Sequence, residues 1–217
     1  MKMRVLRWLG LCAAVLALGG CGVSQPFPDR RFYAIDAGAV TKDAQAPTAR
    51  AVSLRVVPVR VVPPFDAVTF AYKMSPSEFK TDYYHGFAAP AGRLMTEQLI
   101  AWLDGSGAVK FAVGVGTRAH AMYTLEMTVT ALYGDYTDPK KPQAVIETRV
   151  VVLDDDRGGT DILVNKMYRA REAVAGEGGP EKLAEAWSAA WRKMLGEISA
   201  DMAKLPEEKA AGEKRQD

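Results

Sequence analysis

The chain has 217 residues, with 28 Lys and Arg against 26 Asp and Glu, two cysteines and two histidines. A chain of this length suits one hydrophobic core and is small for two. Its near-neutral charge gives no electrostatic case for nucleic-acid binding. His85 and His120 lie in no spacing that is typical of a zinc site.

The chain begins with a basic segment, residues 1–7, followed by an apolar run from Leu9 to Leu18. This pattern, with small residues after it, is typical of a secretory signal peptide, and the run is shorter than the roughly 17–25 residues that cross a membrane. A cysteine directly after Leu-Gly-Gly resembles the bacterial lipobox, in which the chain is cut before the cysteine and its thiol carries diacylglycerol. We therefore expect cleavage between Gly20 and Cys21 and acylation of Cys21, for example with palmitate. The alternative is a signal that is cleaved without lipidation.

Removal of residues 1–20 changes the charge and the cysteine count of the mature chain. It takes away three of the 28 basic residues and no acidic residue, so 25 positive charges face 26 negative ones and the net charge becomes −1. Cys12 is lost with the signal and Cys21 would be a thioether, so no disulfide forms within one mature chain. In enterobacterial lipoproteins an Asp after the cysteine tends to retain the protein in the inner membrane. Gly22 at that position favours the outer membrane.

After the signal we expect a lipidated tether at residues 21–30, one domain at residues 31–205 and a disordered, charged tail at residues 206–217. Proline removes a donor from a β-ladder, so a strand that contains Pro58 should break there or lie on an edge. Eight segments carry strand patterns: Arg31–Asp36, Ala51–Val62, Val68–Lys73, Glu78–Tyr84, Val109–Val113, His120–Tyr133, Ala144–Leu153 and Thr160–Arg169.

Two segments, Ala91–Leu103 and Pro180–Met202, repeat apolar residues at three- and four-residue spacing, which predicts amphipathic helices. The strand His120–Tyr133 alternates apolar residues with Thr and Glu, as in an antiparallel sheet that is covered on one face. The sequence therefore predicts an α+β fold. Its expected form is an antiparallel sheet of about six to eight strands with both helices packed on one face.

No motif in the chain supports catalysis or metal binding. The run Asp154-Asp155-Asp156 lacks the order of a calcium loop and favours a hairpin turn. The segment 114–117 lacks the Gly-Lys-Ser/Thr ending of a phosphate loop, and no G-x-S-x-G occurs. We expect no catalytic residue, no metal and no cofactor.

Two turn-rich segments carry aromatic residues of the kind that protein interfaces use. They predict a partner interface formed by Pro63, Pro64, Phe65, Tyr83, Tyr84 and Phe87. Plain packing in the core is the alternative for each of these side chains.

Several segments of the chain follow one another in a recognisable order: the lipobox, Val61-Val62-Pro63-Pro64-Phe65-Asp66, Phe70-Ala71-Tyr72-Lys73, Asp82-Tyr83-Tyr84-His85-Gly86-Phe87, the helix Ala91–Leu103, Ser106-Gly107 and the helix Ala184–Leu195. In this order they resemble the ABC-type transport auxiliary lipoprotein family, of which PqiC-like proteins are a branch. The resemblance covers essentially the whole mature chain. Two residues depart from the family pattern: Lys73 stands where arginine is expected, and Gly86 where glutamate is common.

The resemblance implies a periplasm-facing, outer-membrane lipoprotein without enzymatic activity, held in the membrane through Cys21. Its implied partners are a periplasmic protein with MCE domains and the ABC transporter of that protein, which move phospholipid or other hydrophobic solutes between the two membranes. The resemblance leaves open a homo-oligomer and does not say whether this chain itself carries lipid.

Two other functions remain as alternatives at this stage. The first is a structural or assembly lipoprotein of another envelope complex, of the lipopolysaccharide or secretin type. The second is a lipid-modifying or peptidoglycan enzyme, which would need a clustered acid, base or nucleophile.

Overall fold

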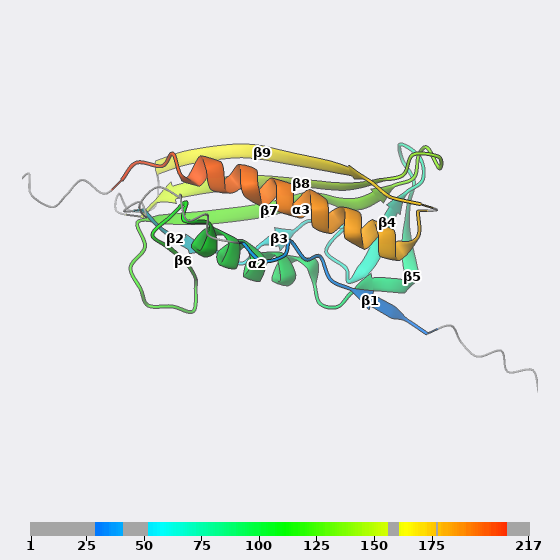
Figure 1. Ribbon diagram of the computed structural model, residues 1–217, viewed down its shortest axis with the longest axis horizontal. Helices are drawn as coiled ribbons and strands as arrows, with labels where there is room; N and C mark the ends of the chain where they lie inside the picture. Colours follow the sequence, from blue (N-terminus) through cyan, green and yellow to red (C-terminus); the bar gives the residue numbers. More distant parts are fainter. Residues whose placement is uncertain (1–28, 41–51, 156–160, 177, 208–217) are drawn as a thin grey trace, which may run out of the picture.

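The computed structural model describes residues 29–40, 52–155, 161–176 and 178–207. The predicted signal peptide, Cys21, most of the tether, the end of the acidic turn and the tail from residue 208 onward lie outside these ranges. Within them the chain forms nine strands and two helices (Figure 1). Their bounds are β1 Arg31–Tyr33, β2 Ser53–Val56, β3 Arg60–Val61, β4 Thr69–Lys73, β5 Phe79–Phe87, α2 Ala91–Ser106, β6 Phe111–Gly114, β7 Tyr123–Asp135, β8 Gln143–Asp154, β9 Asp161–Ala173 and α3 Pro180–Met202.

The long strand β7 organises the sheet. Along one side it pairs in parallel with β2, β3 and β4 in succession, and along the other it pairs antiparallel with β8. The sheet continues from β8 to β9, from β2 to β6, and from β4 through β5 to β1. Short strands that follow one another along the chain therefore fill one edge of a single 13-residue strand.

The α+β class is confirmed, but the prediction of a purely antiparallel sheet of six to eight strands is wrong. The sheet is mixed and has nine strands among the described residues. The ninth arises because the segment predicted as Ala51–Val62 is divided at Pro58 into β2 and β3, as the missing amide donor of proline requires.

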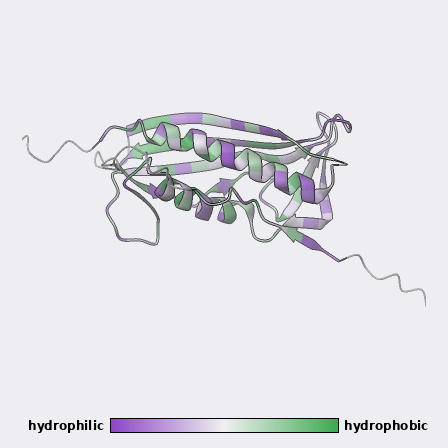
Figure 2. Cartoon of the chain, in the orientation of Figure 1, coloured by the Kyte–Doolittle hydropathy of each residue, from purple (hydrophilic) through white to green (hydrophobic). Residues whose placement is uncertain are grey.

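Both helices lie on one face of the sheet, with α3 over β8 and β9, and α2 over β2, β3 and β6 (Figure 1). Each helix turns hydrophilic residues away from the sheet (Figure 2) and buries its apolar stripe. The main core lies between the two layers, and its largest fully buried side chains include Trp187, Trp191, Tyr168, Phe70, Leu54, Met95, Leu99, Leu103 and Leu125. This arrangement agrees with the predicted packing of both helices on one face.

The segment that follows β1 crosses from the sheet to the helices and is called the strap here (residues 35–37). Gln98 of α2 accepts one strap amide at 2.8 Å and donates to a strap carbonyl. On α3, Ser188 accepts another strap amide at 3.0 Å and Arg192 donates to a carbonyl at 2.5 Å. Ile35 is fully buried, so the strap is fixed to both helices by apolar packing as well as by hydrogen bonds.

Helix α2 packs so closely on the sheet that its first turn admits only a glycine. A Cβ atom added at Gly92 would lie 2.4 Å from the carbonyl oxygen of Val59. The α3 glycine Gly196, by contrast, has no atom within 4 Å of an added Cβ.

We expect Gly92→Ala to lower the free energy of unfolding by about 1–3 kcal/mol, because the added methyl group forces α2 away from the Val59 backbone. The matched change Gly196→Ala should instead stabilise the protein by roughly 0.5–1 kcal/mol, since alanine is the better helix former and the site is open. Urea denaturation of both variants measures the difference. Equal effects of the two substitutions would contradict the close packing.

Candidate functional site

The first candidate surface is formed by the loop before β4 and by the β4–β5 hairpin, on the face of the sheet that the helices leave open. The ring of Phe65 stacks on Tyr133 with centroids 5.6 Å apart, and Phe79 meets both rings edge-on at 5.6 and 5.3 Å. The cluster of Phe65, Phe79 and Tyr133 is called the hairpin cluster here. Pro63 and Pro64, joined by a cis peptide bond, are exposed beside Phe65.

The hairpin cluster rests on a small second core, made by Ala71, Ala131, Tyr133 and Val145. A register shift in β7 between Val129 and Ala131 allows this, because the extra residue reverses the alternation of the strand. Val129 packs in the main core, whereas Ala131 and Tyr133 pack in the second core. Tyr133 is nearly buried, whereas Phe79 keeps 39% of its surface exposed. The cluster is therefore a fixed aromatic base that presents one ring to solvent.

The second candidate surface arises where β5 bends away from β4. Thr69 pairs with Gly86, but Ala71 pairs with Thr81, so four residues, 82–85, lie opposite one residue of β4. Such bulges reorient side chains at sheet edges. Here the bulge exposes Tyr83 by 68% and Tyr84 by 37%.

The carboxylate of Asp82 holds the bulge together. Its Oδ1 accepts the backbone amides of Tyr84 and His85 at 2.8 and 3.0 Å, and its Oδ2 accepts the hydroxyl of Tyr72 at 2.7 Å. The His85 ring nitrogen Nδ1 lies 2.8 Å from the same Oδ2. Burial of the Asp82 carboxyl opposes its ionisation, but these hydrogen bonds outweigh burial and hold its pKa below the usual value. Burial and the bond to Asp82 raise the pKa of Tyr72.

We expect the stability of the protein to fall in acid through Asp82. A carboxyl whose pKa is lower in the folded than in the unfolded state stabilises the fold above the unfolded pKa, about 3.9, and loses that contribution as the pH falls further. Asp82→Asn should cost about 1–2 kcal/mol at pH 6, as for a hydrogen-bonded charge that is partly exposed. Urea denaturation at pH 6 and at pH 3 measures how far the free energy of unfolding falls between the two pH values. We expect a smaller fall for the variant than for the wild type. An equal fall in both proteins would show that Asp82 does not hold the bulge.

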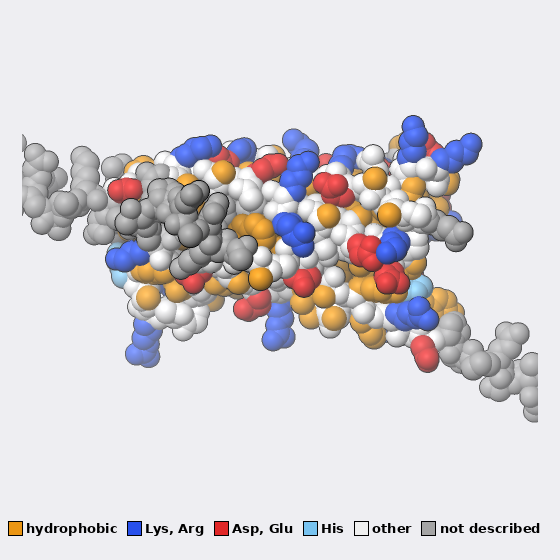
Figure 3. All heavy atoms as spheres, in the orientation of Figure 1, with side chains coloured by type: hydrophobic (Ala, Val, Ile, Leu, Met, Phe, Trp, Pro, Cys, Tyr) orange, Lys and Arg blue, Asp and Glu red, His pale blue; other side chains and the backbone are white. Residues whose placement is uncertain are grey.

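Strand β1 adds to the exposed aromatic groups of the bulge. Phe32 is 54% exposed, and the guanidinium of Arg30 lies 5.5 Å from the Phe32 ring centroid and 5.6 Å from that of Tyr83. These separations are in the range of cation–π contacts. Arg30, Phe32, Tyr83 and Tyr84 are together called the β1 patch here. Figure 3 shows hydrophobic side chains, basic side chains and a histidine at this end of the molecule, with acidic side chains beside them.

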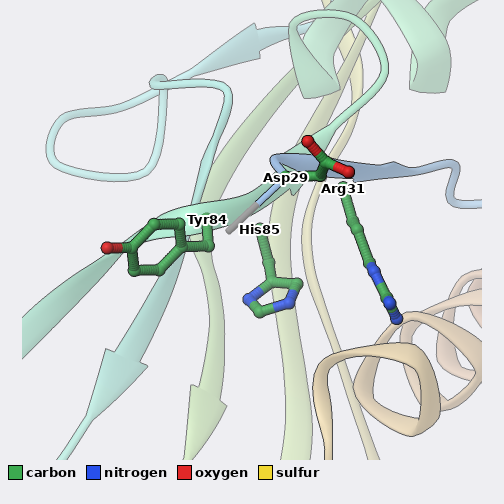
Figure 4. A pocket seen from close by; sticks show the side chains of 4 residues that line it. All are labelled: Asp29, Arg31, Tyr84 and His85. Atoms are coloured by element: carbon green, nitrogen blue, oxygen red, sulfur yellow. The ribbon is translucent and has the colours of Figure 1, made fainter. Parts of the chain in front are cut away.

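A surface hollow of about 380 Å³ adjoins the β1 patch and is lined by Asp29, Arg31, Tyr84 and His85. In Figure 4 the His85 ring lies between the side chains of Tyr84 and Arg31. All four lining residues carry a polar group, but the hollow is open to solvent and does not enclose a ligand as small-molecule sites usually do. Within the described ranges no group of three or more His, Cys, Asp or Glu residues is placed to hold a metal ion.

The structure separates the residues predicted for one interface into three environments. Pro63, Pro64 and Phe65 belong to the hairpin cluster and its rim, and Tyr83 and Tyr84 to the β1 patch. Phe87 is only 3% exposed and packs on Phe70 and Trp187 at 4.8 and 5.3 Å. Its assignment to the interface is corrected, because β5 turns this ring toward the helices.

Gly86 and Lys73 are the two residues that depart from the family pattern, and the structure shows what each of them contacts. Gly86 lies where an added Cβ would come within 2.5 Å of the Val68 carbonyl oxygen, so the backbone would have to move to admit any side chain. The ammonium group of Lys73 lies 5.7 Å from the Tyr133 ring centroid, above the hairpin cluster.

A polar cluster around Asp201 lies at the C-terminal end of α3, and its role is structural. Asp201 accepts hydrogen bonds from Lys166 at 2.5 Å, Lys204 at 2.7 Å and Tyr168 at 2.9 Å. The bond from Lys166 is the main cause that holds the pKa of Asp201 far below its usual value. The cluster ties the end of α3 to β9.

Sequence reasoning missed five residues that form or support these surfaces: Arg30, Phe32, Phe79, Tyr133 and Asp82. The sequence does carry a signal for Asp82, since an Asp that bonds the amide two residues later is a common turn. The other four join these surfaces only through strand pairing, which the side-chain pattern does not encode.

The fold places the chain in a class of mixed α+β domains with solved representatives. Protein XCC0632 from Xanthomonas campestris is similar with a TM-score of 0.65 and 20% identity, over 78% of this chain and 92% of that chain. A second solved structure, of an uncharacterized protein, is similar with a TM-score of 0.62 and 15% identity, over 80% of this chain and 99% of that chain. The hypothetical protein CT253 from Chlamydia trachomatis has a TM-score of 0.47 and 10% identity, over 70% of this chain and 95% of that chain. At these identities the first two show the fold alone.

The chain belongs to the ABC-type transport auxiliary lipoprotein component family, whose model matches residues 33–199. The resemblance seen in the sequence is thereby confirmed. No curated protein sequence matches the chain significantly. Among the helices of the described residues, none combines the length and the apolar character that a membrane crossing requires.

Proposed function

We propose that this chain is an outer-membrane lipoprotein, acylated at Cys21 and facing the periplasm, that acts as a non-enzymatic docking component of an ABC-type system. Its partner would be a periplasmic MCE-domain protein that moves phospholipid or other hydrophobic solutes between the membranes. The observation that carries the proposal is the hairpin cluster, an exposed aromatic ring on a rigid base in a member of a transport auxiliary family.

The physical requirements of such transport favour a docking role. Acyl chains do not cross water unshielded, so a protein path between two membranes needs an attachment at its far end. A lipid anchor raises the effective concentration of the docking surface at that membrane. The same reasoning accommodates several copies of this chain around one partner, and the mass of the purified complex would give their number.

The hairpin cluster has the properties of a binding hot spot. Phe79 is held edge-on against Phe65 and Tyr133, so little conformational entropy is lost when a partner covers it. The exposed prolines Pro63 and Pro64 extend the apolar surface without adding flexible side chains. Aromatic groups of this kind dominate the energetics of interfaces.

We expect Phe79→Ser to weaken binding of the MCE-domain partner by about tenfold or more, as is usual when an aromatic anchor is removed. The matched control is Ile162→Ser, which removes another exposed apolar side chain, 58% exposed on β9. Full-length protein, purified from outer membranes in detergent, would be titrated with the partner and followed by light scattering or interferometry. Circular dichroism would verify the fold of both variants.

An equal loss of affinity in both variants would remove the hairpin cluster as the docking site. Absence of the wild-type protein from outer-membrane fractions, with no MCE protein recovered beside it, would contradict the proposed function itself.

A further inference from the structure

The β1 patch has no role in the docking surface described above. It combines two exposed aromatic groups, Phe32 and Tyr83, with the guanidinium of Arg30 between them. Arg31 and Tyr84 continue it into the adjoining hollow. An exposed group of aromatic side chains of this kind marks a contact site, and the question is what covers it.

We propose that the β1 patch lies against the phospholipid headgroups of the membrane that holds Cys21, and so fixes how the protein stands on that membrane. The proposal rests on the proposed acylation of Cys21. A lipid surface is the expected contact of the patch, because the patch lies where the chain emerges from its anchor.

The length of the chain between the anchor and the folded domain supports contact between the patch and the membrane. Seven residues lie between Cys21 and Asp29, and at full extension the eight steps from one Cα atom to the next span about 28 Å. The β1 patch begins at the next residue, Arg30. Strand β7 runs for 13 residues, or about 40 Å, from the end that carries β2 and β6 to the end that carries β4, β5 and β1 (Figure 1). The anchor therefore keeps the patch within about 28 Å of the bilayer, whereas the opposite end reaches about 40 Å farther from it.

The chemistry of the patch suits a headgroup layer. Tyrosine rings with an apolar body and a polar tip are enriched at membrane–water interfaces, and arginine keeps its charge in water while its stem covers apolar surface. Arg30 and Arg31 give this end two cations for lipid phosphates. Of the neighbouring acids, Asp29 is exposed and lines the hollow with Arg31, whereas the Asp82 side chain is only 15% exposed and is held by four contacts. One exposed acid thus stands against the two arginines.

The arrangement also fits the rest of the structure. The aromatic rings are presented by a bulge that the Asp82 carboxylate fixes, so they form a preformed surface. Phe79 of the hairpin cluster begins β5, and Tyr83 of the patch lies four residues further along the same strand. A protein that stands on the β1 patch would therefore hold the hairpin cluster near the membrane surface, where a partner that reaches this membrane meets it.

The test uses a unique label in the full-length, lipidated protein. Cys21 would be the only cysteine of the mature chain and is blocked when acylated. Tyr83→Cys or Val115→Cys therefore gives one labelling site, at the patch or just after β6 at the opposite end, where Val115 is 55% exposed. Each protein carries an environment-sensitive fluorophore and is reconstituted in vesicles of phosphatidylethanolamine and phosphatidylglycerol that contain spin-labelled lipid as a quencher.

We expect loss of most of the fluorescence at position 83 and little loss at position 115. Combining Tyr83→Cys with Arg30→Gln and Phe32→Ser should reduce the quenching to the level of position 115, although the protein stays anchored. Equal quenching at both positions, or no effect of the two patch substitutions, would overturn the proposal. Shielding of position 83 in detergent that grows with protein concentration would assign the patch to a second copy and would also overturn it.

The outcomes separate this inference from the proposed function. If Cys21 is not acylated, the protein does not enter the vesicles, and the proposed function fails. If the protein is anchored but the label at position 83 remains in water, only the membrane-contact role of the patch fails.

Discussion

Replacing Trp187 by alanine is expected to lower the free energy of unfolding by about 3–5 kcal/mol, the usual cost of removing a buried large aromatic side chain. Trp187 is fully buried on α3. Its ring packs edge-on against Phe70, with centroids 4.9 Å apart, and lies tilted against Phe87 at 5.3 Å. This ring joins the helix to strands β4 and β5. Domains are stable by only about 5–15 kcal/mol, so the variant should lose a large part of its stability in urea or thermal denaturation.

Two further variants show whether the effect comes from the packed ring. Trp187→Phe keeps an aromatic ring and removes a buried Nε1–H that has no hydrogen-bond partner among the described residues, so its cost should be only about 1–2 kcal/mol. Trp102→Ala removes a partly exposed ring from α2 and should also cost less. A loss at Trp102 as large as at Trp187 would contradict the buried position assigned to Trp187.

Cys21→Ser should remove the protein from the outer membrane. Each buried methylene group of an acyl chain contributes roughly 0.8 kcal/mol to membrane binding, and two or more chains give stable anchoring. Serine provides no thiol for the thioether bond, so the acyl mass on the amino-terminal peptide should disappear. Mass spectrometry of the purified protein and fractionation of the membranes measure the two effects.

Cys12 provides the matched control, because it lies within the predicted signal peptide and is discarded with it. Cys12→Ser should leave the mass of the mature protein and its location unchanged. A wild-type protein whose chain begins at Cys21 with no acyl group would refute the prediction of a lipid anchor.

The secondary structure was largely predictable, because the strands and helices carry strong periodic patterns. The segment predicted as His120–Tyr133 is β7, Tyr123–Asp135, and the helices begin at or next to the prolines that predicted their starts. The pairing of the strands was not predictable in the same way. Parallel pairing of β2, β3 and β4 with β7 depends on where the intervening chain crosses, which alternation of side chains does not encode.

The candidate surfaces were predictable only in part. Exposed aromatic groups near Pro63 and Tyr83 followed from turn-rich sequence, but Phe87 has the same local context and is buried. The difference is made by the β5 bulge, whose extra residues decide which rings face the helices. Likewise, residues 35 and 36 of the strap were predicted to continue the strand Arg31–Asp36, whereas β1 ends at Tyr33. The strap amides bond to Gln98 and Ser188, residues distant in the sequence, and so leave the β-ladder.

The strap has a mechanical consequence for a protein held at its amino-terminal end. Strand β1 has only three residues and lies at the edge of the sheet, so a pulling force could peel it away at small cost. Peeling would stop at the strap, because Gln98 and Arg192 clamp its backbone to two different helices. If the proposed lipid anchor and docking surface are correct, a load applied when two membranes move apart would be shared by the helical layer, and the hairpin cluster would stay in place while the anchor is stretched.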